Sequence, residues 1–177
     1  MEIRLPECVI RYYRTDDAPS LARYANNCKV WRNLTDIFPH PYQLSDAEAY
    51  IAKSITAIPQ SSFAIVVNGE AVGGIGLHPH SDVFRGTASL GYWLGEPFWG
   101  RGIATAAVRA ITPWAFEHLD LQRIEAAVFA WNPASARVLE KCRYMFEGRL
   151  RRSVTKDGEV TDQLMYSILV DDCSRVP

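Results

Sequence analysis

The sequence predicts an α/β fold of the mixed α+β type, with a mixed, mostly antiparallel, seven-stranded sheet flanked by about four helices. Strand-like and helical segments follow one another in the order β-αα-βββ-α-β-α-ββ, so antiparallel hairpins and βα units share one layer. The length of 177 residues suits a single compact domain over 1–177, with a core from about residue 8 to 170 and a short polar tail at 171–177.

The predicted strands share a high content of β-branched and aromatic residues between turn residues. They are 8–14, 62–67, 70–77, 87–94, 123–130, 144–149 and 163–170. Asn68-Gly69 is a strong hairpin turn between the second and third strands, because both residues tolerate positive φ. Lys156-Asp157-Gly158 joins the last two strands.

Capping residues and apolar spacing predict the helices. They are expected at about 16–25, 49–58, 102–119 and 133–141. Ser45 and Glu48 form a capping-box pattern before the second helix. Pro113 should kink or interrupt the third helix, and Asn132-Pro133 is a favourable start for the fourth.

Composition excludes several classes of function. The net charge of −1 gives no bulk attraction to nucleic acid or to a membrane surface, so neither partner is expected. The one basic cluster, 149–152, is typical of a solvated strand end. No apolar run approaches the ~18 residues that span a bilayer, and no secretion signal is recognisable. The four cysteines have neither metal-ligand nor redox spacing, which favours a cytoplasmic location.

A bound metal is not expected. His78 and His80 lie in a predicted polar loop with a proline between them, and the spacing suggests no third ligand. Cys142 lies in an apolar helical segment, which argues against a nucleophilic thiolate.

Glycines stand where the fourth strand leads into the third helix, at Gly100-Arg101-Gly102. The first amides of a helix lack internal partners, and glycines allow an anion to approach the backbone closely. A phosphate site is one interpretation, and a simple glycine-rich turn is the other. No lysine followed by Ser or Thr closes the loop, and the G-x-G-x-x-G spacing is absent, so neither a P-loop nor a dinucleotide-binding turn is expected.

Two motifs in order carry a family resemblance. Trp99-Gly100-Arg101-Gly102-Ile103-Ala104 follows the strand Gly91-Tyr92-Trp93-Leu94, and the segment 131–142 begins Trp131-Asn132-Pro133-Ala134-Ser135 about 30 residues later. Together with the segment 38–42, Phe-Pro-His-Pro-Tyr, they resemble the GNAT N-acetyltransferase superfamily, in the branch of ribosomal-protein N-terminal acetyltransferases (RimJ/RimL-like).

The resemblance implies an acyltransferase that uses acetyl-CoA as cosubstrate, on a sheet that splays between its fourth and fifth strands. The pantetheine arm is expected to lie in that gap, and backbone amides of the glycine loop are expected to hold the pyrophosphate. The expected CoA-binding residues are Trp93, Leu94, Trp99, Gly100, Arg101, Gly102, Ile103, Ala104, Thr105, Asn132 and Ser135.

Three residues are candidates for catalysis. Glu96 is the candidate base, Ser135 the candidate proton donor to the CoA thiolate, and Tyr144 the alternative donor. Each has a structural alternative: an inert exposed glutamate, a hydroxyl that supports a helix cap, and a core tyrosine. Asn132 could likewise be a cap alone.

The acceptor is the open question. Asp36 and His40 are expected to face the acceptor amine, which the resemblance suggests is a protein N-terminal α-amine. A small-molecule amine or polyamine acceptor, or a CoA-binding sensor without turnover, are the alternatives. Relatives are often monomers or dimers.

The sequence departs from the family pattern at three positions. Trp99 stands where Gln or Arg is usual, Ser89 where relatives often carry a glutamate, and Arg143 where glycine is usual. Because position 89 carries serine and not glutamate, the sequence has no obvious base at that position.

Overall fold

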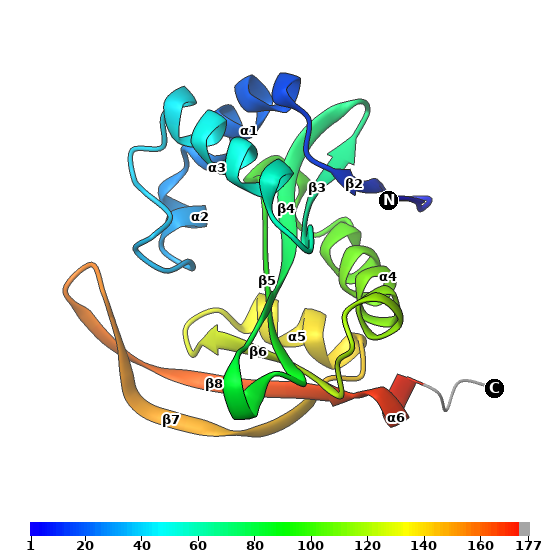
Figure 1. The fold of residues 1–177 in the computed structure, drawn as a ribbon. Coiled ribbons are helices and arrows are strands. Elements are labelled where there is room, and N and C mark those ends of the chain that lie inside the picture. The colour runs from blue at the N-terminus through cyan, green and yellow to red at the C-terminus, as the bar shows by residue number, and fades with distance from the viewer. Residues whose placement is uncertain (174–177) are drawn as a thin grey trace. The chain divides into compact units, whose positions relative to one another are not determined.

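A computed structural model describes residues 1–173, and this part of the chain forms two compact units. The first unit comprises residues 1–76 and 92–107, and the second comprises 77–91 and the chain from Val108 onward. Figure 1 traces the chain through its strands and helices. Hydrogen-bonded neighbours among the strands follow the order β1-β2-β3-β4-β5-β6-β8-β7.

The first unit is an antiparallel meander covered by helices. It contains β1 (Glu2–Arg4), β2 (Val9–Tyr12), β3 (Ser62–Val67), most of β4 (Glu70–Pro79) and the end of β5 (Thr87–Leu94), with η1 (Thr15–Asp17), α1 (Ala18–Ala25), α2 (Cys28–Trp31) and α3 (Leu44–Thr56). Its core joins the sheet to α1 and α3 through Tyr13, Leu21, Ile51 and Ala64, all at most 4% exposed. This packing fixes the segment around Trp93, which lies against the same core.

The second unit holds the parallel pair and the C-terminal hairpin. It contains η2 (Asp82–Phe84), β6 (Arg123–Phe129), β7 (Met145–Lys156), β8 (Glu159–Leu169), α5 (Pro133–Lys141), α6 (Val170–Cys173) and most of α4 (Ile103–His118). β6 and β8 are antiparallel, and so are β7 and β8. β5 pairs with β6 in parallel, over Thr87–Ser89 and Arg123–Glu125 only. The ladder ends there, so Leu90 and Gly91 extend beyond the paired part of β6.

The predicted mixed, mostly antiparallel α/β fold is confirmed, with differences in the short elements. Among residues 1–173 there are eight strands and six α-helices, against the seven and about four predicted. β1 has only three residues, while α2 and α6 are single turns. Such short segments carry too little periodicity to be recognised in a sequence.

Three helical segments also differ from the prediction. α3 begins at Leu44, five residues before the predicted start, because the Asp46 carboxylate accepts a hydrogen bond from the Gln43 backbone amide (2.7 Å). The Ser45–Glu48 pair therefore lies inside the helix. α4 continues through Pro113 without interruption. The predicted tail is partly helical, since α6 covers 170–173; residues 174–177 lie outside the described residues.

The hairpin of β7 and β8 is longer than predicted (Figure 1). Its turn residues Asp157 and Gly158 both have positive φ, +50° and +75°. The basic cluster 149–152 lies in β7 and is exposed, as expected of a solvated strand, and Arg149 forms an ion pair with Asp162 (3.4 Å). Because β7 is exposed along most of its length, its sequence shows no alternation of apolar and polar residues.

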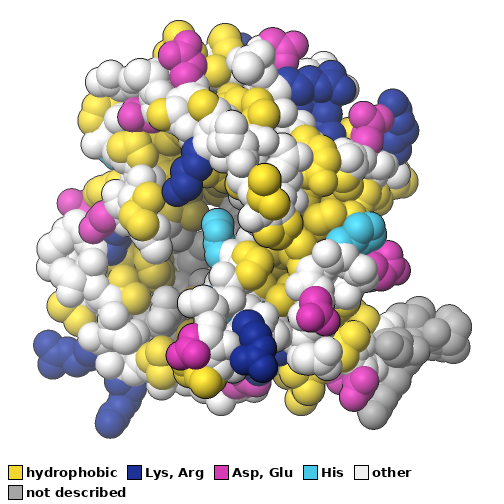
Figure 2. Space-filling model, viewed as in Figure 1, with side chains coloured by type: hydrophobic (Ala, Val, Ile, Leu, Met, Phe, Trp, Pro, Cys, Tyr) yellow, Lys and Arg dark blue, Asp and Glu magenta, His cyan; other side chains and the backbone are white. Residues whose placement is uncertain are grey.

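Charged side chains are interspersed on the face drawn in Figure 2, with no single basic patch. This distribution agrees with the near-zero net charge. No described helix is long and apolar enough to span a membrane.

An ion pair joins β6 to β7 in the second unit. Arg123 donates two hydrogen bonds to the Glu147 carboxylate (2.7 and 2.5 Å), and the Ser167 hydroxyl donates a third (2.7 Å). The bonds from Arg123, followed by the bond from Ser167, lower the pKa of Glu147 from 4.5 to about 2.

We predict that Glu147→Gln destabilises the protein in a pH-dependent way. A depressed folded-state pKa contributes stability that is fully present above about pH 4.5 and is lost as the pH falls through about 2. The pair is partly exposed, so the expected loss at pH 7 is about 2 °C in Tm. In thermal melts, the difference in Tm between Glu147→Gln and the wild type should shrink as the pH falls from 4.5 to 2. Glu117→Gln on exposed α4 surface is the control, and a pH-independent difference for Glu147→Gln would contradict the prediction.

Candidate active site

The glycine loop lies in the first unit, between β5 and α4. After β5, the short helix η3 (Glu96–Phe98) leads to Trp99, and α4 begins at Ile103. Gly100 and Gly102 have φ of +74° and +79°. These values favour glycine, since an L-residue there is strained by ~1–2 kcal/mol. The loop conformation therefore depends on both glycines.

The loop presents backbone amides at the start of α4. The Gly102 carbonyl accepts the amide of Ala106 (2.9 Å), which closes the first helical turn. The amides before Ala106 belong to the part of a helix that lacks intrahelical acceptors, and the helix dipole favours an anion there. A Cβ added at Gly100 or Gly102 would meet no atom within 4 Å, so the space beside both residues is open. Such an end can bind a phosphate group.

The side chains beside the loop are held in place. The Arg101 guanidinium lies 5.4 Å from the ring centre of Phe98, and its side chain is exposed. The Trp99 indole donates a hydrogen bond to the Leu94 carbonyl (2.6 Å). That carbonyl, predicted to pair with the pantetheine arm, keeps one lone pair for a second donor.

A close backbone approach in the first unit positions the end of β5. A Cβ at Gly73 of β4 would lie 2.4 Å from the Trp93 carbonyl oxygen and 3.0 Å from the Leu94 Cα. The Gly95 amide also donates to the Val72 carbonyl (2.8 Å). β4 therefore sets where Trp93 and Leu94 lie, and only glycine fits at position 73.

The predicted acceptor segment packs against the same part of β5. The Phe38 ring lies 5.5 Å from Trp93, edge to face, and His40 stacks on Trp31 at 5.3 Å. Asp36 and His40 are exposed. The structure thus brings the segment that carries Asp36 and His40 together with Trp93 in one unit.

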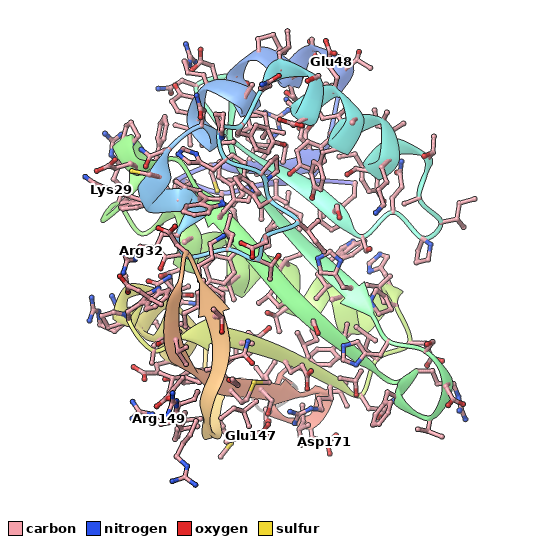
Figure 3. All side chains as sticks on the ribbon, turned by 90° about the vertical axis from the view of Figure 1, so that its left-hand side faces the viewer. Lys29, Arg32, Glu48, Glu147, Arg149 and Asp171 are labelled. Carbon is pink, nitrogen blue, oxygen red and sulfur yellow. The ribbon has the colours of Figure 1, made fainter. Side chains whose placement is uncertain are left out.

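Glu96 is held by two donors rather than free. Lys29 of α2, labelled in Figure 3, forms an ion pair with it, and the Asn27 amide donates to its other oxygen (2.8 Å). The bond from Lys29, followed by that from Asn27, lowers the pKa of Glu96. A lowered pKa weakens a carboxylate as a base, and the assignment of Glu96 as the base stays a prediction.

In the second unit, Asn132 caps α5. Its side-chain oxygen accepts a hydrogen bond from the Ser135 amide (3.2 Å), with Pro133 at the first helical position. The predicted capping role is confirmed. The Asn132 side-chain NH2 group is not used in this cap, so the capping role is compatible with a contact to pantetheine.

Tyr144 lies in the core of the second unit. It is 3% exposed, and its hydroxyl is 3.0 Å from that of Thr112, which itself donates to the Val108 carbonyl (2.8 Å). Tyr144 therefore donates to Thr112. This placement favours the structural alternative for Tyr144, and its role as a proton donor stays a prediction.

The position of Cys142 disfavours a nucleophilic role for its thiol. Burial raises the pKa of the Cys142 thiol, which disfavours the thiolate. All four cysteines are free. Within residues 1–173, no three side chains of His, Cys, Asp or Glu gather as metal ligands do.

One pair of residues was missed by the sequence analysis. His80 and Glu125 lie beside Ser89 in the second unit, although the sequence suggested His80 only as a metal ligand to be excluded. Glu125 alternates with apolar residues in β6, a pattern that marks an outward-facing position but no chemistry.

Known proteins resemble the chain over most of its length. The model of the acetyltransferase (GNAT) domain family matches residues 8–145. An uncharacterized N-acetyltransferase, p20 of Bacillus licheniformis, is 31% identical over 90% of this chain and 91% of its own. The ribosomal-protein-serine acetyltransferase of Escherichia coli (strain K12) is 27% identical over 62% of this chain and 60% of its own.

A solved structure extends the likeness to the fold. Mycobacterium smegmatis RimJ, in complex with a CoA disulfide, superposes with a TM-score of 0.82 and 27% identity, covering 97% of this chain and 87% of that one. Several curated relatives match over only about half of their own length.

Proposed function

Since the chain belongs to the GNAT acetyltransferase family, we propose that it is an N-acetyltransferase that transfers the acetyl group of acetyl-CoA directly to a protein N-terminal α-amine. The observation that carries the proposal is the pair of positive-φ glycines, Gly100 and Gly102, at the start of α4. Their open amides suit the pyrophosphate of CoA. Arg101 adds a positive charge beside it.

The pantetheine arm runs, in this proposal, along the edge of β5 that β6 leaves unpaired. Backbone groups of Trp93 and Leu94 bond to it as a neighbouring strand would. The Asn132 side-chain NH2 group is a further donor to the arm, and Ser135 is the proton donor to the leaving thiolate. Asp36 and His40 contact the acceptor.

The chemistry favours an α-amine. An amine attacks a thioester only when neutral, and an α-amine has a pKa of ~7.7–8.0 against ~10.4 for lysine. The α-amine is therefore partly neutral at pH 7 without help. In the reaction the nitrogen–carbon bond forms, the carbon–sulfur bond breaks, and the CoA thiolate takes up a proton.

We also infer that the chain is one N-acetyltransferase domain, because a single family match runs from residue 8 to 145 through both units. We propose a cytoplasmic location, which the four free thiols support.

A turnover assay tests the proposal. The protein is incubated with acetyl-CoA and one acceptor at a time, and thiol release is followed. The acceptors are a peptide with a free N-terminal serine, the same peptide with a blocked N-terminus, a lysine peptide, spermidine and an aminoglycoside.

We expect thiol release with the free N-terminus and none with its blocked copy. Thiol release with spermidine or the aminoglycoside alone would show that the acceptor is a small-molecule amine and not a protein N-terminus. CoA binding in calorimetry without release from any acceptor would instead indicate a sensor.

A further inference from the structure

Three elements of the second unit bring a histidine, a serine and a glutamate together. His80 follows β4, Ser89 lies in β5 and Glu125 in β6. The His80 Nε2 atom is 2.8 Å from the Ser89 hydroxyl oxygen and 4.0 Å from a Glu125 carboxylate oxygen. The side chain of His80 is 31% exposed and that of Glu125 is 23% exposed, so solvent or a ligand can reach the group.

Backbone pairing and an ion pair hold this group in place. The His80 amide donates to the Thr87 carbonyl (2.9 Å), and Ser89 and Glu125 are register partners in the parallel ladder. Arg123 contacts Glu125 (3.3 Å) and is itself bound to Glu147, the β7 residue labelled in Figure 3. The positions of the imidazole and the carboxylate therefore follow from the sheet.

The arrangement suits a proton acceptor. A neutral imidazole that directs its Nε2–H toward Ser89 and Glu125 keeps its lone pair on Nδ1. No hydrogen bond of His80 Nδ1 is found within residues 1–173. The Glu125 carboxylate stabilises the imidazolium that forms when Nδ1 takes up a proton, as an orienting carboxylate does for other catalytic histidines.

The group stands where the parallel ladder ends. Ser89 and Glu125 are its last pair, and Gly91, two residues on, is exposed. His78 lies on the same side, with its Nε2 atom 3.7 Å from the point that a Cβ at Gly91 would occupy. The proposed function lays the pantetheine arm along the unpaired edge of β5, the strand to which Ser89 belongs.

We propose that His80 is the catalytic base, oriented by Ser89 and Glu125, and that its Nδ1 atom takes a proton from the acceptor ammonium group; this inference rests on the proposed function. The nitrogen loses two protons overall. One passes to His80 and on to solvent, and the other leaves after attack on the thioester and ends on the CoA sulfur through Ser135. The nitrogen–carbon bond forms as the carbon–sulfur bond breaks.

Kinetics of His80→Gln test the proposal. Glutamine keeps a donor toward Ser89 but cannot take up a proton at neutral pH. At pH 7 we expect kcat to fall by about 5–10-fold, because only about a tenth to a sixth of an α-amine with a pKa of ~7.7–8.0 is neutral without a base, while the Kd for CoA changes less than about twofold. His118→Gln, an exposed histidine stacked on Trp114, is the control and should retain wild-type kcat.

The pH profile separates a catalytic from a structural role. Besides His78 of β4, the titratable and charged groups around His80 are Glu125, Arg123 and, through the arginine, Glu147. His80→Gln should shift the acidic limb of the kcat profile to higher pH, towards the ~7.7–8.0 pKa of a free α-amine, because the variant depends on amine that is already neutral. Glu125→Gln should lower kcat, because the imidazolium loses its counter-charge. Wild-type kcat and pH profile in His80→Gln, or the same shift of the limb in Glu96→Gln instead, would overturn the proposal.

A measurement without substrate tests the role of His80 independently of whether the protein is an acetyltransferase. Nitrogen-15 NMR of the imidazoles, assigned by comparison with His80→Gln, reports the tautomer of His80. We expect the Nε2–H tautomer at neutral pH. The Nδ1–H tautomer would overturn the role of His80 even if the enzyme turns over, whereas absence of CoA binding and turnover in wild type would overturn the proposed function.

Discussion

Replacing both Gly100 and Gly102 by alanine is expected to weaken CoA binding about 100-fold while the protein stays folded. Each position has positive φ, and alanine adds strain of ~1–2 kcal/mol there. The free loop relieves this strain by changing its backbone angles, which turns the amides away from the anion. Binding must then restore the strained conformation, and about 2.7 kcal/mol over both positions corresponds to the 100-fold loss.

Gly158 supplies the matched control. It has φ of +75° and open space around its Cα, like the two loop glycines, but it lies in the β7–β8 turn. Gly158→Ala should therefore lower Tm through the same kind of strain and leave the Kd for CoA unchanged. Isothermal titration calorimetry gives the Kd for CoA of the wild type, the double glycine variant and Gly158→Ala. An equal loss of affinity in Gly158→Ala would show that general destabilisation, and not the loop, weakens binding.

The substitution Asp17→Asn is expected to cause the largest loss of stability. Asp17 and Arg11 form a two-fold hydrogen-bonded ion pair (2.7 Å each), and they are 4% and 7% exposed. The Asp17 carboxylate also accepts a hydrogen bond from the Arg14 amide (2.8 Å). Asparagine keeps an acceptor for that amide but leaves the buried guanidinium without its counter-charge.

Breaking a buried pair from one side is destabilising by about 3–5 kcal/mol, which for a chain of this size lowers Tm by on the order of 10 °C. Asp16→Asn, at the exposed neighbouring position, should change Tm by less than about 2 °C. Urea denaturation gives the free energy of unfolding of each variant, and scanning calorimetry gives its Tm. A small effect of Asp17→Asn would mean that water reaches Arg11 and the pair is not buried in solution.

Local patterns were sufficient to predict most of the long elements. The hairpin at Asn68-Gly69 and the Asn132 cap each depend on residues within a few positions of one another, and both are present. The glycine loop was recognisable for the same reason, since two glycines and a helix start lie within six residues. α3 was placed too late because Ser45 and Glu48 imitate a cap that Asp46 provides from within the helix.

Long-range partners were not predictable. Glu96 is separated from Lys29 by 67 positions, so nothing near it in sequence indicates an ion pair that lowers its pKa. His80 and Glu125 meet only because β4, β5 and β6 are neighbours in the sheet. Ser89 alone suggested a missing base, and only the strand register shows which groups surround it.

The most direct test of the account is a crystal structure of the protein with acetyl-CoA. We predict pyrophosphate oxygens about 2.9 Å from backbone amide nitrogens between Gly100 and Ala104, the distance of an N–H···O hydrogen bond. Pyrophosphate bound elsewhere on the protein, with these amides in contact with water alone, would contradict the assignment of the loop as the CoA site.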